Sequence, residues 1–261
     1  MKTKYFNVMA VGDVVGPNTI EYIKTRLWKF RQENDISLVV VNAENACVGN
    51  GLDSTAARTL LSAGADVITS GNHIWRKNEI RSYLDQTSEV IRPANYPASA
   101  PGNGYVKYNA DGKIFLVMNV LGVIYMEPLD CPFTTVEKIL EKEKGNYDYA
   151  ILDIHAEATS EKIALARYFD GRINVIFGTH THVTTADEQV LPEGTGYITD
   201  LGMCGPIDST LGIKNECIIE KLKNKMPVKF EIAGGEIEAN CTVFTIDEEI
   251  QRVVKVRRIK L

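Results

Sequence analysis

Short apolar runs alternate with longer stretches of helical apolar spacing over the first two thirds of the chain. The apolar runs are rich in β-branched residues and predict strands at residues 6–11, 37–42, 65–70, 113–120, 149–154 and 174–179. The stretches between them predict helices at residues 18–33, 54–63, 77–84, 135–143 and 160–169. Continuously apolar strands separated by helices are typical of a layered α/β fold with a largely parallel sheet.

Residues 228–261 follow a different pattern. Polar and apolar residues alternate there around the turn signal Gly234-Gly235, which predicts antiparallel strands that close a second sheet. The sequence contains no internal repeat, low-complexity tract or Pro/Ser-rich linker. We therefore expect a single domain over residues 1–261.

Composition and charge exclude several classes of protein. Hydrophobic residues make up 44% of the 261 residues and charged residues 24%, which is typical of a globular protein and not of a disordered or collagen-like chain. The formal net charge of −5 gives no overall electrostatic reason to bind a long nucleic acid. A local cationic site can still bind a short nucleotide.

The sequence also predicts the cellular location of the protein. No segment approaches the roughly 20 consecutive apolar residues of a membrane helix, and the first residues lack the apolar stretch of a secretory signal. The five cysteines are scattered and form no C-x-x-C pair, which indicates reduced thiols and not a disulfide framework. We expect a cytoplasmic protein without a membrane partner.

Polar side chains follow five of the predicted strands at the point where each strand ends. Ligands of α/β proteins bind outside the carboxyl ends of strands, and all four histidines of the chain lie in these segments. Clusters of histidine and carboxylate suit first-row transition metals. The residues concerned are Asp13, Glu44, Asn45, Asn72, His73, His155, His180 and His182.

Longer motifs surround these residues. In chain order they read GDVVG, NAEN, GNHIW, RPANYP, DIHAEATSEKIA and GTHTHVTTADEQVLPEGTGYITDLGMCGP, and they span roughly residues 8 to 213. They resemble the signature blocks of the YmdB-like branch of the calcineurin-like metallophosphoesterases. The resemblance implies a sandwich of two mixed β-sheets flanked by helices. It further implies a bacterial cytosolic phosphodiesterase that acts on 2′,3′-cyclic nucleotides through two metal ions, with iron or manganese preferred, and that can form a homo-oligomer.

The same resemblance assigns a role to each candidate residue. One metal would be held by Asp13, Glu44, Asn45 and His182. The other would be held by Glu44, Asn72, His155 and His180, with Glu44 bridging the two ions. His73 would be the general acid. The sequence departs from the superfamily pattern at Val15, where D-x-H has histidine, and at Ile74, where GNHE has its acid. Asn45 would replace the missing imidazole with an oxygen ligand.

The residue types fit attack by a metal-bridging hydroxide on an anionic phosphoester. Two divalent ions outweigh the charges of two carboxylates and one hydroxide, because the asparagines and neutral histidines add none. Such a metal pair lowers the pKa of its bound water to about 7 and clamps the phosphoryl oxygens. Imidazole can then protonate the poor alkoxide leaving group.

Other interpretations remain beside this one. A metal-containing nucleotide sensor or regulator with little turnover would need the same residues. A dinucleotide-binding module is disfavoured because the first turn lacks G-x-G-x-x-G, and a metalloprotease because H-E-x-x-H is absent.

Residues outside the cluster have two interpretations each. Arg92, Asn95 and Tyr96 could contact a phosphate or nucleotide, or serve only to hold a rigid loop. Glu157 could support a ligand imidazole or cap a helix, and Asp153 could orient a neighbouring histidine.

Overall fold

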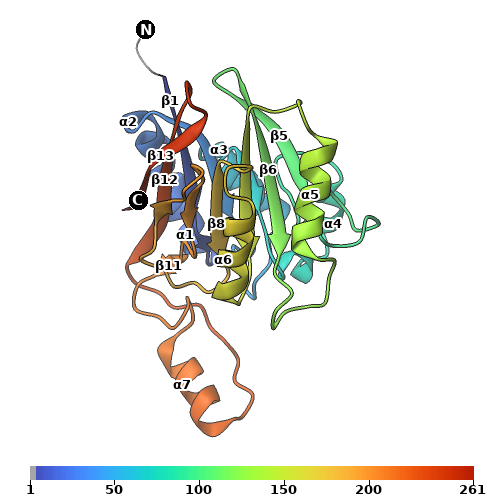
Figure 1. Ribbon diagram of the computed structural model, residues 1–261. Coiled ribbons are helices and arrows are strands. Elements are labelled where there is room, and N and C mark those ends of the chain that lie inside the picture. Colours follow the sequence, from blue (N-terminus) through green and yellow to red (C-terminus); the bar gives the residue numbers. More distant parts are fainter. Residues whose placement is uncertain (1–3) are drawn as a thin grey trace.

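Two β-sheets pack face to face in the computed structural model, which describes residues 4–261, and helices cover their outer faces (Figure 1). The seven-stranded sheet has the order β2-β11-β12-β1-β3-β4, with β13 paired to β12. Its strands are β1 (Tyr5–Val11), β2 (Asp13–Val14), β3 (Ile36–Asn42), β4 (Val67–Thr69), β11 (Met203–Pro206), β12 (Ile237–Asp247) and β13 (Arg252–Lys260).

The six-stranded sheet has the order β5-β6-β7-β8-β10-β9. Its strands are β5 (Tyr105–Ala110), β6 (Lys113–Leu121), β7 (Tyr149–His155), β8 (Val175–Thr179), β9 (Gln189–Val190) and β10 (Gly196–Ile198). Both sheets are mixed: β1, β3 and β4 are parallel to one another, as are β6, β7, β8 and β10, while β12 is antiparallel to its neighbours. The predicted sandwich of two mixed sheets is confirmed.

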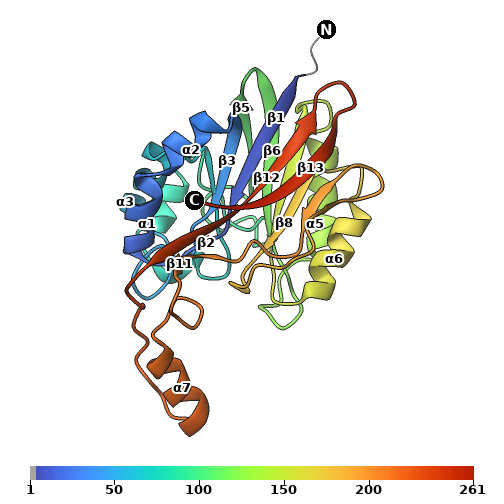
Figure 2. The same cartoon turned by 90° about the vertical axis from the view of Figure 1, so that its left-hand side faces the viewer.

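Helices form the outer layers. The chain contains α1 (Pro17–Lys24), α2 (Leu27–Glu33), α3 (Ser54–Ser62), the 3-10 turn η1 (Ile74–Arg76), α4 (Ile80–Leu84), α5 (Pro132–Lys142), α6 (Thr159–Tyr168) and α7 (Asn215–Asn224). Figure 2 shows α1, α2 and α3 on one side of the sandwich and α5 and α6 on the other. No helix within residues 4–261 is long and apolar enough to cross a lipid bilayer.

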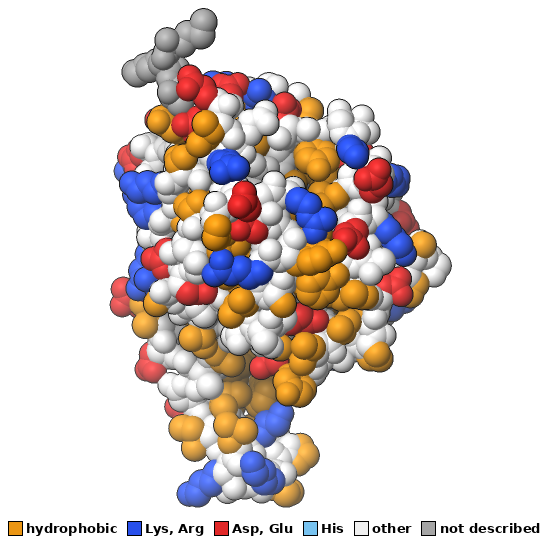
Figure 3. Space-filling view, viewed as in Figure 1, with side chains coloured by type: hydrophobic (Ala, Val, Ile, Leu, Met, Phe, Trp, Pro, Cys, Tyr) orange, Lys and Arg blue, Asp and Glu red, His pale blue; other side chains and the backbone are white. Residues whose placement is uncertain are grey.

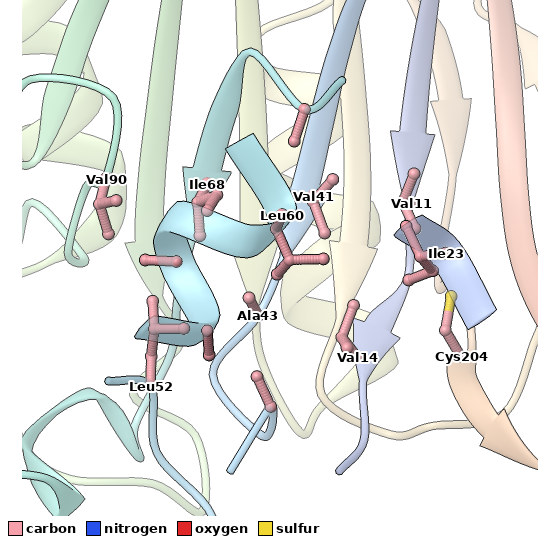
Figure 4. Close-up of a cluster of buried hydrophobic side chains, with 14 of the residues drawn as sticks. Val11, Val14, Ile23, Val41, Ala43, Leu52, Leu60, Ile68, Val90 and Cys204 are labelled. Carbon is pink, nitrogen blue, oxygen red and sulfur yellow. The ribbon is translucent and has the colours of Figure 1, made fainter. Parts of the chain in front are cut away.

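The strands β3, β7 and β8 are buried along their whole length because both faces of the sheets are covered there. Successive side chains of a strand point to opposite faces, so Phe6 and Val8 of β1 enter the core between the sheets, whereas Met9 and Val11 face the helices. Figure 4 shows the cluster beneath α1 and α3, with Ile23 and other apolar side chains packed against the first sheet. A third cluster lies between the second sheet and the helices α5 and α6.

The structure corrects several predicted elements. The helix predicted at 18–33 is two helices, because the chain turns tightly at residues 25–26, where the N–H of Arg26 bonds to the carbonyl of Ile23. The apolar spacing continues across this break and hides it. The helix predicted at 77–84 begins only at Ile80, since Lys77 is extended after η1.

The C-terminal prediction was correct about antiparallel strands and wrong about their position. The antiparallel pair is β12–β13, joined at residues 248–251, whereas Gly234-Gly235 precedes β12. β12 does not close a second sheet. It lies inside the first sheet, between β1 and β11, because its alternating apolar residues complete the cores on both faces. The helix α7 was not predicted. The single domain over 1–261 stays a prediction, and residues 1–3 of its N-terminal stretch lie outside the described residues. Within residues 4–261 the five cysteines are all free thiols.

The core between the sheets is tested by Phe6→Ala. Phe6 is fully buried and packs against the rings of Phe115 and Tyr149, with centroids 6.2 and 5.6 Å away. We expect a loss of about 3–5 kcal/mol in the free energy of unfolding, since an aromatic core truncation leaves a cavity. The control Tyr5→Ala, at the adjacent exposed residue, should change it by no more than about 0.5 kcal/mol in urea denaturation. Equal losses in both variants would contradict this account of the core.

Candidate metal centre

The polar residues predicted at the strand ends meet at one rim of the sandwich. Glu44 and Asn45 follow β3, Asn72 and His73 follow β4, His155 ends β7, and His180 and His182 follow β8, while Asp13 begins β2 just after β1. The parallel strands of both sheets end on the same side of the sandwich, and the face-to-face packing of the sheets brings these strand ends close together. Hydrogen bonds and close charge pairs connect these side chains into one group.

The Glu44 carboxylate lies at the centre of this group and is 1% exposed. Its Oε1 is 3.1 Å from Nε2 of His155 and 3.0 Å from Nδ2 of Asn45. Its Oε2 accepts a hydrogen bond of 2.9 Å from the backbone N–H of His73. One carboxylate thus contacts groups from its own loop after β3, from the loop after β4 and from the end of β7.

On one side of Glu44, three further side chains converge on a single point. Nε2 of His155 lies 3.1 Å from Oδ1 of Asn72 and 3.1 Å from Nδ1 of His180. Ligand atoms of Glu44, His155 and His180 all lie within 4.8 Å of one another. Ligand atoms roughly 3 Å apart can share one ion at the 2.0–2.2 Å distances typical of nitrogen and oxygen ligands. This group can hold a transition metal.

On the other side of Glu44 lie Asp13, Asn45 and His182. Nδ2 of Asn45 is 3.2 Å from Nε2 of His182, which in turn is 3.9 Å from Oδ1 of Asp13. Oδ1 of Asp13 is buried and has no hydrogen-bond partner among the described residues. A buried carboxylate oxygen without a partner is costly unless a cation compensates it, so this second group also fits a metal. To bind a metal through Oδ1, the Asn45 amide would have to rotate, because Oδ1 lies 2.9 Å from Nδ1 of His73.

The carboxylates give this rim a field that attracts positive charge. Burial alone would raise the pKa of the Glu44 carboxyl, but the neighbouring His155 and His73 hold it well below its usual range. Burial lowers the pKa of His155, yet Glu44 and Asp13 outweigh it and raise that pKa to about 9. A metal ion that binds here displaces such a proton.

The pKa of His180 is shifted in the opposite direction from that of the neighbouring His155. Burial and the neighbouring His155 lower the pKa of His180 to about 3, so its imidazole is neutral and suited to metal ligation. Burial raises the pKa of Asp13 to about 6.

Comparison with known proteins identifies the family. The family model described as YmdB-like protein matches residues 9–259. The chain belongs to the YmdB-like family. It is 41% identical over 252 residues to the 2′,3′-cyclic-nucleotide 2′-phosphodiesterase of Bacillus subtilis (strain 168), with 97% of this chain and 96% of that protein covered.

Two crystal structures share the fold of this YmdB-like chain. A hypothetical protein from Thermus thermophilus is 38% identical with a TM-score of 0.92, over 98% of this chain and 99% of that one. A chain from Mycoplasma pneumoniae, described as a novel phosphatase, is 32% identical with a TM-score of 0.93, over 99% of this chain and 94% of that one.

A buried network holds the ring of His155 in this YmdB-like site. Nδ1 of His155 lies 2.9 Å from Oγ1 of Thr179, which donates a hydrogen bond of 2.7 Å to Oδ1 of Asp153. Asn42 and Thr69 donate to the other oxygen of Asp153. This arrangement turns Nε2 of His155 toward Glu44. It also explains why the apolar strand β7 contains a carboxylate: Asp153 orients His155 through the hydroxyl of Thr179. Glu157 contacts His180 and not His155: its Oε2 lies 3.1 Å from Nε2 of His180.

The loop after β8 has an unusual backbone. His180 and His182 have φ values of 97° and 64°, in the region that L-residues rarely adopt. The N–H of His180 donates to Oδ2 of Asp13 at 3.1 Å, which helps to hold this conformation. Local strain of this kind persists where surrounding contacts fix it, and such places are often functional sites.

Sequence reasoning missed the buried pair that supports this loop. Nζ of Lys162 donates a hydrogen bond of 2.6 Å to Oδ2 of Asp200, and the same oxygen accepts from the N–H and hydroxyl of Thr181. Lys162 is fully buried in α6. Its position at a helix start gave no signal of burial, and Asp200 was not among the predicted site residues.

Three residues of the RPANYP motif serve the loop and not the cluster. The Arg92 guanidinium is buried and donates to the carbonyls of Pro93 and Pro101. The Asn95 amide donates to the carbonyls of Leu121 and Asp130. The Tyr96 ring packs edge-on against Trp75. The structural interpretation of this motif is therefore the one that fits.

The network behind His155 predicts the effect of Thr179→Val. The substitution keeps the shape of the side chain and removes the hydroxyl that links His155 to Asp153. We expect Mn²⁺ affinity to fall about 10–100-fold, the usual effect of losing a partner of a metal-binding histidine. Calorimetric titration measures this, with Thr179→Ser as the matched control that keeps the hydroxyl. Unchanged affinity in the valine variant would show that the network does not orient His155.

Proposed function

We propose that this chain is a dinuclear metal-dependent phosphodiesterase of small nucleotides, with 2′,3′-cyclic nucleotides as its substrates. The observation that carries the proposal is the shared carboxylate of Glu44, which has a group of potential ligands on each side. The orphaned oxygen of Asp13 supports the same conclusion. The substrate follows from the name of the Bacillus subtilis relative.

Each ion has its own set of ligands in this proposal, with Glu44 common to both. Asp13, Asn45 and His182 complete the first set, and Asn72, His155 and His180 complete the second. Imidazole and carboxylate ligands together suit iron or manganese. When bound, a pair of such ions supplies a water of lowered pKa and a clamp for the phosphoryl oxygens.

His73 is placed to act as the general acid. Its backbone is fixed by the bond to Glu44, and its Nδ1 lies 3.3 Å from Oε1 of the same carboxylate. The ring lines the same cavity as Glu44, His180 and His182. Its Nε2 is therefore the atom that delivers a proton to the leaving alkoxide oxygen, which is the task of a general acid.

The ligand types also select the charge of the substrate. Only Asp13 and Glu44 are anionic among the proposed ligands, while the amides and the imidazole of His180 are neutral. Two divalent ions therefore leave the centre net positive. This charge favours a phosphodiester anion over a neutral ester.

The acid assignment predicts the behaviour of His73→Ala. We expect kcat for 2′,3′-cyclic AMP to fall about 10²–10⁴-fold with the metal content unchanged, because only the proton donor is lost. Bis(p-nitrophenyl) phosphate should be far less affected, since its leaving group needs no proton. Turnover of 2′,3′-cyclic and 3′,5′-cyclic AMP that does not change in this variant would refute the assignment. Bound metal in the wild type without turnover of any phosphoester would instead favour a nucleotide sensor.

The bridging role predicts a different result for Glu44→Ala. Because this carboxylate belongs to both sets, its loss should empty both metal positions in elemental analysis of the purified protein. Glu141→Ala is the matched control, since Glu141 is an exposed residue of α5 that pairs with Lys144, and its loss should leave the metal content near the wild-type value. Full occupancy in the alanine variant would contradict a bridging Glu44.

A further inference from the structure

Residues 207–236, here called the arm, project from the sandwich beyond the rim that holds the metal ligands (Figures 1 and 2). The arm leaves β11, contains α7 and returns into β12. Its two legs are joined by a bridge between Ile213 and Ile232 and by an ion pair of 2.6 Å between Lys214 and Glu231. At its base, the carbonyl of Leu211 lies 3.3 Å from Nδ1 of His182. The base of the arm is thus in contact with a residue of the candidate metal centre.

The helix of the arm has an apolar face that the rest of the chain does not bury. No residue of α7 is buried, yet Ile218 and Leu222 are one turn apart and share one face. Phe230 follows on the returning leg and is 42% exposed. Hydrophobic side chains gather where the arm meets the body, and lysines mark its tip (Figure 3). A helix of ten residues gains little stability of its own in water, so contact of this face with another apolar surface would stabilise it.

A single cavity connects that apolar face with the candidate metal centre. Its volume is about 960 Å³, at the upper end of the range of roughly 300–1,000 Å³ found for small-molecule sites. Its lining includes Glu44, His73 and His180 of the rim. It also includes Ile218, Leu222 and Phe230 of the arm. The cavity therefore offers both the polar groups of the rim and an apolar surface on the arm.

We infer that the arm binds the nucleobase of the substrate, with the base packed against Phe230, Ile218 and Leu222 while the phosphate lies at the metal centre. This inference rests on the proposed function and assigns a second subsite to it. A nucleoside cyclic phosphate matches this lining, because it has an anionic phosphate at one end and a flat base at the other. Lys229 and Glu231 of the arm also line the cavity, one with each sign of charge. Packing against apolar and aromatic side chains tolerates any base, so the arm selects nucleotides as a class.

The test compares two substrates and two faces of the arm. Phe230→Ala and Leu222→Ala remove the proposed base contacts, whereas Ile219→Ala changes an exposed residue of α7 that does not line the cavity. The substrates are 2′,3′-cyclic AMP and glycerol 1,2-cyclic phosphate, which has the cyclic diester and no base. We expect each of the first two variants to raise KM for cyclic AMP roughly tenfold, with kcat and the turnover of the glycerol ester unchanged. Ile219→Ala should match the wild type on both substrates.

Three results would overturn the inference. One is an unchanged KM for cyclic AMP in both cavity variants. Another is an equal change on the glycerol ester, which would mean that the arm supports the metal centre and not the base. The third is a loss of activity in Ile219→Ala together with a lower mass in sedimentation, which would assign the apolar face to a second copy of this chain.

Binding measurements separate this inference from the proposed function. If the wild-type protein hydrolyses neither substrate, the phosphodiesterase proposal fails. Calorimetric binding of adenosine 2′-monophosphate then still tests the arm. A roughly tenfold weaker affinity in Phe230→Ala, with Ile219→Ala unchanged, supports the base subsite, and equal affinities refute it.

Discussion

Burial of the Glu44 carboxylate is the constraint around which the rim is organised. An anion that is 1% exposed is expensive unless positive charge or hydrogen-bond donors surround it. The chain supplies part of this compensation through His155, the amide of Asn45 and the N–H of His73. Oδ1 of Asp13 stays without a partner among the described residues. The proposed metal ions would supply the missing positive charge, and metal binding would then be coupled to the stability of this rim.

The sandwich explains why the predicted site residues lie at this rim and not in the middle of the strands. Both faces of each sheet are covered, and a polar side chain inside a strand must find its partners within the core. Asp153 is such a case and needs three donors, from Asn42, Thr69 and Thr179. At the strand ends the backbone turns away, which leaves room for side chains that serve chemistry. The network of Asp153 then extends the rigidity of the core to His155.

Sequence patterns were sufficient where the signal is local. β3, β6 and β7 were predicted to within one residue at each end, and the strand-end histidines followed from the predicted strands β4, β7 and β8. The very short strands β2, β9 and β11 show no period, and β12 takes its place through pairing with β1, which is distant in sequence. The Lys162–Asp200 pair could not be predicted, because a lysine in a helix is usually exposed and only the tertiary structure reveals its partner. The arm was missed for a related reason: α7 has no core to face, so its apolar residues form no pattern that continues into a neighbouring element.

The arm and the rim meet different physical requirements of one small ligand. The rim recognises charge, and its strength comes from groups that are rigidly held and partly removed from water. As proposed, such a site would attract phosphoester anions whatever group they carry. The arm would add apolar contact at a distance from the reacting atoms, where binding energy can position a substrate without entering the chemistry. The carbonyl of Leu211 at the base of the arm lies 3.3 Å from Nδ1 of His182, so the arm and the rim are in direct contact. On these proposals, discrimination between nucleotides and other phosphoesters belongs to the least buried part of the fold, and reactivity belongs to the rim around the buried Glu44 carboxylate.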